Sequence, residues 1–350
     1  MKSFLIQTLQ QIEETIMNTK IVYVVISTLK DVYFEQVWCS AYTALVHNST
    51  CHLTLVCDEE TLTVAQSNYR TNGLNLFKEI IPITCPQEMS NVQRSRYLKT
   101  NLRNIVRGDF LFLDSDTVVQ NSLKDIDEVK DSVAMVIDMH EVNAINPIFK
   151  TYKNVYGEDY SIEYPYYNSG VIYAKDNNEA KIIFENWFEN WQQLGARLGY
   201  TDQTPLAKTN IQLGFPIKEL SGEWNCQTCN GVRYLHKARI LHIFNHPFFF
   251  PTITHPLMLK ETYLSIQREG NLTEELKKIL LNAKSEFYSL SSPVGADVLQ
   301  FLDRYLTMYI VYNIWKKNPV LFNIIEKISM FVYRRLVKFH ITKPFKKWDD

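Results

Sequence analysis

Residues 108–119, GDFLFLDSDTVV, decide the fold and give the first hypothesis about function. The apolar run 110–113 is short enough for a buried strand, and it stops abruptly at Asp114 and Asp116. Two carboxylates therefore follow a core strand at its carboxyl end, which is the edge of an open α/β sheet where ligands bind. Such a pair can share Mg²⁺ or Mn²⁺ through oxygen ligands. An Asx turn that merely ends a strand has the same pattern, so both interpretations stay open.

Strand and helix patterns alternate on both sides of this stretch. Short β-branched or apolar runs predict strands, and longer segments with inward-facing residues at helical spacing predict helices. The predicted strands are 21–26, 52–56, 77–83, 110–113, 133–137, 166–174 and 239–243, and the predicted helices include 31–46, 90–107 and 180–194. This alternation predicts a Rossmann-like α/β fold with a mostly parallel sheet flanked by helices. Pro82 places 77–83 at a sheet edge or at a strand end.

Length and charge bound the domain organisation and the class of partner. A chain of 350 residues exceeds what one core usually fills, so we expect a large domain with a smaller appendage. The pattern divides into a helical leader at 1–19, a main domain at 20–256 and a helical region at 257–350. Thirty-seven basic residues against thirty-eight acidic ones give a net charge of −1, so charge provides no argument for a nucleic-acid partner.

The cysteines and the hydropathy pattern indicate a cytoplasmic location. The six cysteines lie mostly inside apolar runs, as reduced core cysteines of cytosolic proteins do. The first residues contain no signal-peptide core, and no apolar run reaches the roughly 18 residues that a membrane span needs.

Basic residues follow one side of the helix predicted at 90–107. Arg96, Lys99 and Arg103 recur at i, i+3 and i+7, next to the face that packs on the sheet. A basic stripe beside the two aspartates would suit a diphosphate. An ordinary solvated helix face is the alternative.

The segment Asn168-Ser169-Gly170 interrupts the strand predicted at 166–174. A small, hydrogen-bonding bulge with a glycine lets a ligand approach the backbone closely. A simple strand bulge would use the same residues.

Two further positions carry polar candidates. Thr201 is the expected N-cap of a short helix that opens with Asp202 and Gln203. His242 lies in the last short strand, and a histidine there is more often structural than a metal ligand.

Four motifs in this order, LDSDTVV, YYNSGVIYA, YTDQTPLA and ILHIFNH, resemble the retaining glycosyltransferases of family 8. The resemblance covers about residues 20–250. It implies a GT-A fold, a nucleotide-activated sugar donor, usually a UDP-sugar, and Mn²⁺ as the cofactor, with Mg²⁺ as the alternative. The domain at 20–256 would then be catalytic and would transfer a hexose with retention to a saccharide or glycolipid acceptor.

The resemblance also implies roles for individual residues. Asp114 and Asp116 would hold the metal together with His242, and Asp202 and Gln203 would lie beneath the reacting anomeric carbon. The expected donor-binding residues are Ser27, Arg96, Lys99, Asp114, Asn168 and Gly170, with Ser27 beside the uracil or ribose and Asp114 also near the ribose.

One departure from the family pattern concerns the diphosphate. In the family, a Gly-x-x-Lys-Pro-Trp segment follows the metal histidine and its lysine grips the diphosphate, whereas residues 244–249 here read FNHPFF. Phosphate neutralisation would then come from Arg96, Lys99 or His246, and the identity of the donor stays open.

Two other functions fit part of the pattern. FLFLDSDTVV also matches a haloacid-dehalogenase-type phosphohydrolase, in which Asp114 would be the nucleophile and Asp116 an acid or base. That family needs a further acidic pair downstream, and Asp-Asp occurs here only at 349–350. A GT-A-like module that binds without catalysing a reaction is the third alternative.

The region 257–350 changes in composition. It is rich in aromatic and aliphatic residues, and residues 327–347 contain seven Lys or Arg and no acid. A basic, aromatic amphipathic helix suits an anionic membrane surface, so we expect a peripheral location on the cytoplasmic membrane face. Packing on the main domain with solvated lysines is the alternative.

Overall fold

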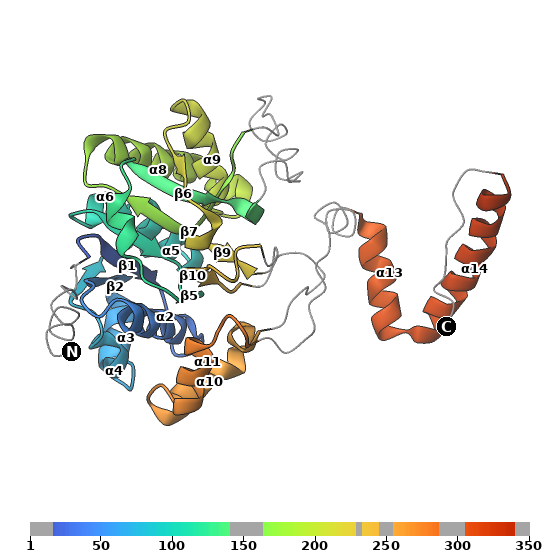
Figure 1. Ribbon diagram of the computed structural model, residues 1–350, viewed down its shortest axis with the longest axis horizontal. Coiled ribbons are helices and arrows are strands. Elements are labelled where there is room, and N and C mark those ends of the chain that lie inside the picture. Colours follow the sequence, from blue (N-terminus) through green and yellow to red (C-terminus); the bar gives the residue numbers. More distant parts are fainter. Residues whose placement is uncertain (1–16, 141–163, 229–232, 245–254, 287–304, 340–350) are drawn as a thin grey trace, which may run out of the picture. The chain divides into compact units, whose positions relative to one another are not determined.

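The computed structural model describes residues 17–140, 164–228, 233–244, 255–286 and 305–339 (Figure 1). The chain divides by its contacts into two compact units. Unit 1 comprises residues 1–246 and 251–293, and unit 2 comprises 247–250 and 294–350. The helical leader expected at 1–19 lies almost entirely outside the described residues.

A seven-stranded sheet forms the centre of unit 1. Its strands are β1 (Lys20–Val25), β2 (Leu53–Asp58), β3 (Glu79–Ile83), β4 (Phe110–Leu113), β6 (Val133–Ile137), β7 (Tyr167–Ala174) and β8 (Lys218–Glu219), in the order β3-β2-β1-β4-β7-β6-β8. Strand β7 pairs antiparallel with both β4 and β6, and the other pairs are parallel. The prediction of a mostly parallel sheet is therefore confirmed, and β3, which contains Pro82, lies at an edge as expected.

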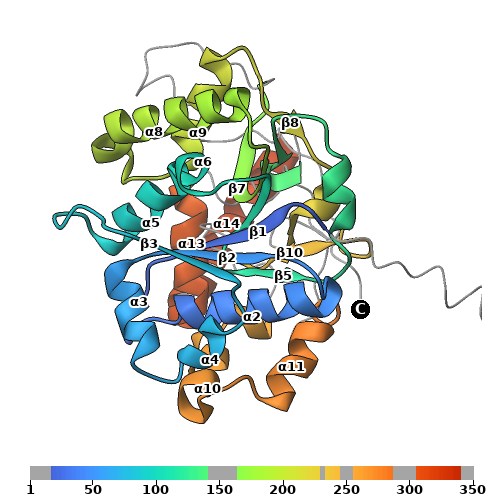
Figure 2. The ribbon, with the colours of Figure 1, turned by 90° about the vertical axis from the view of Figure 1, so that its left-hand side faces the viewer.

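Helices cover both faces of this sheet (Figure 2). One face carries α2 (Tyr33–His47), α3 (Glu59–Gln66) and α4 (Thr71–Leu74), and the other carries α5 (Asn91–Thr100), α6 (Leu102–Ile105), α8 (Asn178–Leu198) and α9 (Gln203–Gln212). Each face has its own apolar cluster, with Trp38 in the first and Trp187 in the second. Because the central strands β1 and β4 are buried on both faces, they read as unbroken apolar runs.

The helix expected at 90–107 is two helices. Ser90 begins α5 with a capping box to Gln93, and the backbone leaves helical geometry at Asn101 (φ −97°, ψ 2°) before α6 starts. The prediction of one continuous helix was wrong, because an asparagine tolerates non-helical backbone where a leucine or lysine would favour another turn.

A second, three-stranded sheet brings distant residues to the aspartates. Strand β10 (Ile240–His242) lies between β5 (Thr117–Val119) and β9 (Cys226–Gln227). In this register His242 pairs with Thr117, and the backbone N–H of Ile243 donates to the carbonyl of Asp116 at 2.9 Å. The last strand is thereby fixed beside the Asp-Ser-Asp turn.

Two irregular features lie at the end of β6. The pairing with β7 shifts register between Met135, which faces Ile172, and Val136, which faces Asn168. Beyond β6, a 3₁₀ turn (Asp138–His140) contains Met139 and His140 at positive φ, 59° and 56°. Such strained backbone is typical of functional sites.

The remaining described elements of unit 1 are the 3₁₀ turns η1 (Lys124–Glu128), η3 (Gly222–Trp224) and η5 (Pro256–Met258) and the helices α10 (Lys260–Glu269) and α11 (Glu274–Leu281). Both helices contact α2, and Leu276, Leu280 and Tyr263 are buried. Contacts thus extend unit 1 beyond residue 256, where the sequence pattern had placed the boundary.

The described part of unit 2 consists of α13 (Leu306–Lys317) and α14 (Pro319–Lys338), which contact each other. Neither helix has a buried residue. Among the described residues, no helix is long and apolar enough to cross a membrane.

Candidate active site

Three ligating side chains converge at the carboxyl end of β4. Asp114 follows β4, Asp116 precedes β5 and His242 ends β10, and one ligand atom from each lies within 4.8 Å of the others. The Nε2 atom of His242 is 3.2 Å from Oδ1 of Asp116. Two carboxylates and one imidazole form a donor set suited to Mn²⁺, and Mg²⁺ also accepts such carboxylates. The residues therefore fit a divalent cation.

Charge complementarity around Asp116 is strong. Burial would raise its pKa, but His242 and the backbone hydrogen bond hold the pKa of Asp116 below its ordinary value. The carboxylate is thus ionised at neutral pH, as a metal ligand must be.

Lys99 is a buried cation between two carboxylates. Its side chain is 1% exposed, and Nζ lies 2.8 Å from Oδ2 of Asp202, 3.2 Å from Oδ1 of Asp114 and 3.2 Å from Oγ of Ser169. It comes from the last turn of α5, on the basic stripe that was predicted. Lys99 is therefore no part of a solvated helix face, and it already neutralises two acids of the site.

Asp202 is buried beside two cations. Nε of Arg96 lies 3.3 Å from its Oδ1, and Ser169 donates a hydrogen bond to its Oδ2 at 2.9 Å. Burial alone would raise its pKa, but Arg96 and Lys99 hold the pKa of Asp202 well below the ordinary range. Asp202 thus places a fixed negative charge next to Gln203, the first residue of α9.

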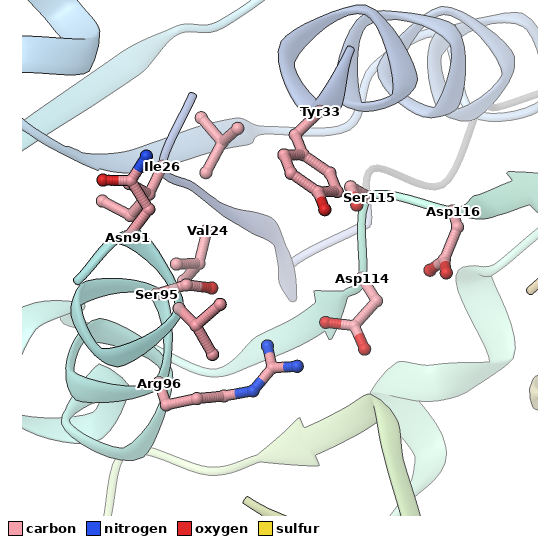
Figure 3. A pocket seen from close by; sticks show the side chains of 11 residues that line it. Val24, Ile26, Tyr33, Asn91, Ser95, Arg96, Asp114, Ser115 and Asp116 are labelled. Atoms are coloured by element: carbon pink, nitrogen blue, oxygen red, sulfur yellow. The ribbon is translucent and has the colours of Figure 1, made fainter. Parts of the chain in front are cut away.

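A pocket of about 200 Å³ opens beside the aspartates (Figure 3). It is lined by residues from β1 and its end, α2, α5 and the Asp-Ser-Asp turn, namely Val24, Val25, Ile26, Tyr33, Asn91, Val92, Ser95, Arg96, Asp114, Ser115 and Asp116. In Figure 3 the guanidinium of Arg96 points toward Asp114. The charge of Asp202, followed by those of Asp114 and Asp116, raises the pKa of Arg96, so a permanent cation faces the pocket.

Ser27 is held away from this pocket lining. Ser27 is buried, and its hydroxyl donates a hydrogen bond to the carboxylate of Asp31 at 2.5 Å. The Oγ atom of Ser27 also accepts a hydrogen bond from the backbone N–H of Phe34. The residue thereby shapes the turn that presents Tyr33. The expected position of Ser27 beside a base or ribose stays a prediction.

Asn168 and Gly170 lie behind the histidine. A Cβ on Gly170 would be 2.1 Å from Cε1 of His242, so the missing side chain makes room for the imidazole. Asn168 is 3% exposed and hydrogen-bonds to Asp138, Gly170 and Asn225. The space beside Gly170, where we expected a ligand to approach the backbone, is therefore occupied by His242.

Three residues of the site were not found from the sequence. Asp138 follows β6 at the same sheet edge as Asp114, and this position could have identified it from the sequence. Burial raises the pKa of Asp138, although hydrogen bonds from Asn168 and Gln203 act to lower it. Tyr33 begins α2 and lines the pocket. Asn225 accepts a hydrogen bond from Nδ1 of His242 at 3.0 Å, and no sequence pattern marks it.

Comparison with models of protein families assigns the chain to one family. Residues 2–249 match the family model described as Glycosyl transferase family 8. The chain belongs to glycosyltransferase family 8. The predictions of the family, of the fold class and of a glycosyltransferase are thereby confirmed. Neither the phosphohydrolase nor the non-catalytic alternative is retained.

Similar solved structures include other glycosyltransferases. The galactosyltransferase LgtC in complex with donor and acceptor sugar analogs is 16% identical, with a TM-score of 0.47, and the match covers 74% of this chain and 99% of that one. Mouse xyloside xylosyltransferase 1 in its apo form is 14% identical, with a TM-score of 0.45, covering 64% and 97%. The glycosyltransferase GlyE of Streptococcus pneumoniae is 16% identical, with a TM-score of 0.44, covering 79% and 67%. Comparison with curated protein sequences gave no match.

Proposed function

We propose that this family 8 enzyme is a metal-dependent hexosyltransferase that moves a sugar from a UDP-sugar to a saccharide or glycolipid acceptor with retention. The observation that supports this most is the ligand set of Asp114, Asp116 and His242 next to a pocket that carries Arg96. A nucleotide would lie in the pocket and its diphosphate would reach the ligand set.

Tyr33, Asn91 and Ser95 support the nucleotide part of the proposal. The ring of Tyr33 offers an aromatic face for a base, and such stacking is sequence-tolerant. The carboxamide of Asn91 and the hydroxyl of Ser95 lie one helical turn apart on α5 and can bond the edge of a base.

The charges of the site divide the chemistry between its two sides. When bound, Mn²⁺ or Mg²⁺ would stabilise the negative charge that develops on the departing diphosphate. Arg96 adds a fixed positive charge on the same side. Asp202 and the side-chain oxygen of Gln203 would face the anomeric carbon, where positive charge develops, and a preorganised carboxylate stabilises such charge.

Release of UDP from a panel of UDP-sugars, measured with Mn²⁺, Mg²⁺ or EDTA, tests the proposal. We expect metal-dependent release from one or a few donors, and loss of at least about 100-fold in rate for Asp116→Ala, since a missing ligand also removes the charge stabilisation. Asp125→Ala, which removes an exposed carboxylate, is the matched control. UDP release that is equal in wild type and Asp116→Ala would refute the assignment.

We also propose that unit 2 binds an anionic membrane surface on the cytoplasmic side. Its helix α14 exposes apolar side chains on one face, including Ile324, Ile328 and Phe331, and its last turn carries Arg335 and Lys338. Apolar burial together with attraction to anionic lipids would hold it there. Such binding would bring the enzyme to a lipid-linked acceptor.

A further inference from the structure

A chain of side-chain hydrogen bonds extends from His242 away from the aspartates. Nδ1 of His242 is 3.0 Å from Oδ1 of Asn225, and Nδ2 of Asn225 donates to Oδ1 of Asn168 at 2.9 Å. Nδ2 of Asn168 in turn donates to Oδ1 of Asp138 at 2.9 Å. Both asparagines are buried, so these contacts are shielded from water.

The backbone N–H of Gly170 fixes the direction of the whole chain. This group can only donate, and it donates to Oδ1 of Asn168 at 3.0 Å. The carboxamide of Asn168 must therefore turn its nitrogen toward Asp138. Since Oδ1 of Asn168 is an acceptor, Asn225 must offer it the amide nitrogen and must present its own oxygen to His242. Nδ1 of His242 is then the protonated nitrogen.

This direction has a consequence for Nε2. With Nδ1–H directed at Asn225, Nε2 is the ring nitrogen that faces the ligand set, 3.2 Å from Oδ1 of Asp116, and its lone pair is the one that a cation between the two groups would use. Hydrogen bonds in series polarise one another, and this series ends on the carboxylate of Asp138. Metal-ligating histidines commonly donate their second N–H directly to a carboxylate or carbonyl. Here the carboxamides of Asn225 and Asn168 would connect the histidine N–H to the carboxylate of Asp138.

We propose that Asn225 is a positioning residue that accepts a hydrogen bond from Nδ1–H of His242 and so directs Nε2 to the cation, with Asn168 and Asp138 supporting Asn225. The metal part of this inference rests on the proposed function. The tautomer part does not, because it concerns the metal-free protein.

A purely structural role for Asn225 predicts something different. A buried carboxamide that only satisfies its neighbours would affect stability and leave the histidine tautomer and the metal affinity unchanged. Asn190 provides the comparison, because it is also a buried asparagine whose Nδ2 donates to two side chains, Thr209 and Gln212, at 2.9 Å each.

The first experiment reads the tautomer directly. The metal-free protein, labelled with ¹⁵N-histidine, is studied by NMR, with the His242 signal assigned from His242→Ala. We expect a protonated Nδ1 that donates a hydrogen bond in wild type and in Asn190→Leu. Asn225→Leu removes the acceptor of this hydrogen bond, so the ring should carry its proton on Nε2, next to the carboxylate of Asp116. A wild-type ring with no proton on Nδ1 overturns the inference.

The second experiment measures the affinity for Mn²⁺ alone by electron paramagnetic resonance. We expect Asn225→Leu to bind about 10- to 100-fold more weakly, with Asn190→Leu close to wild type. Asp138→Asn keeps the shape of the side chain but removes its charge, and it should weaken Mn²⁺ binding by a smaller factor. This variant provides the test if Asn225→Leu does not fold. Unchanged affinity in both variants overturns the proposal. Wild-type protein that binds no Mn²⁺ refutes the proposed function, while the tautomer measured without metal still decides the role of Asn225.

Discussion

Asp202 shows how a single residue departs from local helix rules at this site. It stands at the N-cap of α9, yet its side chain makes no capping hydrogen bond. Its carboxylate contacts Lys99, Arg96 and Ser169 instead. A helix whose first N–H groups are left uncapped loses about 1 kcal/mol of stability. Here the carboxylate of Asp202 forms ion pairs instead of the capping hydrogen bond.

Replacement of Asp202 by Asn should lower stability at neutral pH. The loss is about 3 kcal/mol, the lower end for a broken buried pair, because Lys99 keeps Asp114 as a partner. The folded-state pKa of Asp202 is below its ordinary value of 3.8, so its contribution is present above that pH and is lost as the pH falls further. Urea unfolding of wild type and Asp202→Asn between pH 7 and 3 should therefore show a difference that shrinks only below about pH 4.

The exposed Asp125→Asn is the control for this series, since it also removes a paired carboxylate but should change stability by less than about 1 kcal/mol. A difference between wild type and Asp202→Asn that stays constant through the acid range would contradict the role given to the ion pairs.

Gly170→Ala should displace His242. The added Cβ would lie 2.1 Å from Cε1 of the ring, so the imidazole must move and Mn²⁺ affinity should fall at least about 10-fold. In a His242→Ala background, where the ring is absent, the same substitution should have little effect on stability. A double-mutant cycle in thermal unfolding measures this coupling. Equal effects of Gly170→Ala in both backgrounds would rule out the steric explanation.

Sequence reasoning reached some residues of the site and missed others for a physical reason. Asp114 and Asp116 could be found because a strand and its end are local patterns. Asn225 could not be found, because its partners Asn168 and His242 become neighbours only when β9, β10 and the start of β7 meet. The sequence predicts a close approach at Gly170, but the group that approaches it is the side chain of His242 and not a ligand.

At the scale of elements, periodicity predicted the strands well and the helix ends poorly. The seven strand segments predicted from apolar runs all appear, since strands that are buried on both faces, such as β2, β4 and β7, require such runs. Thr201 was expected to cap α9, but Asp202 occupies the N-cap. The break at Asn101 was missed because helical spacing of apolar residues continues on both sides of it.

Helix α14 provides a test of the membrane proposal. Ile324, Ile328 and Phe331 are 51%, 59% and 61% exposed and share one face at i, i+4 and i+7. Changing all three to Glu should reduce co-sedimentation with phosphatidylserine-containing vesicles about 10-fold or more, because apolar burial is lost.

A variant with three glutamates at polar positions, Asn323→Glu, Ser329→Glu and Thr307→Glu, adds the same charge without removing apolar surface. It should retain most of the binding. Equal loss in both variants would indicate attraction by charge alone, and equal sedimentation of all three proteins would refute membrane binding by this face. Full-length variants are preferable to truncation at 256, which would also remove α10 and α11 from unit 1.

For the whole molecule, the two units should respond differently to ligand. Unit 1 has a large buried core, whereas the described helices of unit 2 bury no residue. Calorimetry should therefore show one cooperative transition from unit 1. Mn²⁺ with UDP at 100 times the dissociation constant should stabilise it by about 2.7 kcal/mol. A transition that does not move, or that moves equally with Asp116→Ala, would contradict the location of the nucleotide site in unit 1.

The pairing of β10 with β5 also determines when the enzyme becomes competent during synthesis. The aspartates leave the ribosome long before His242, and the three-stranded sheet cannot close until β10 has emerged. A nascent chain that has folded only as far as β7 holds Asp114 and Asp116 but lacks His242. On the proposed function, the metal site is therefore completed only after β10 has been translated, late in the synthesis of unit 1, and unfinished chains would lack activity.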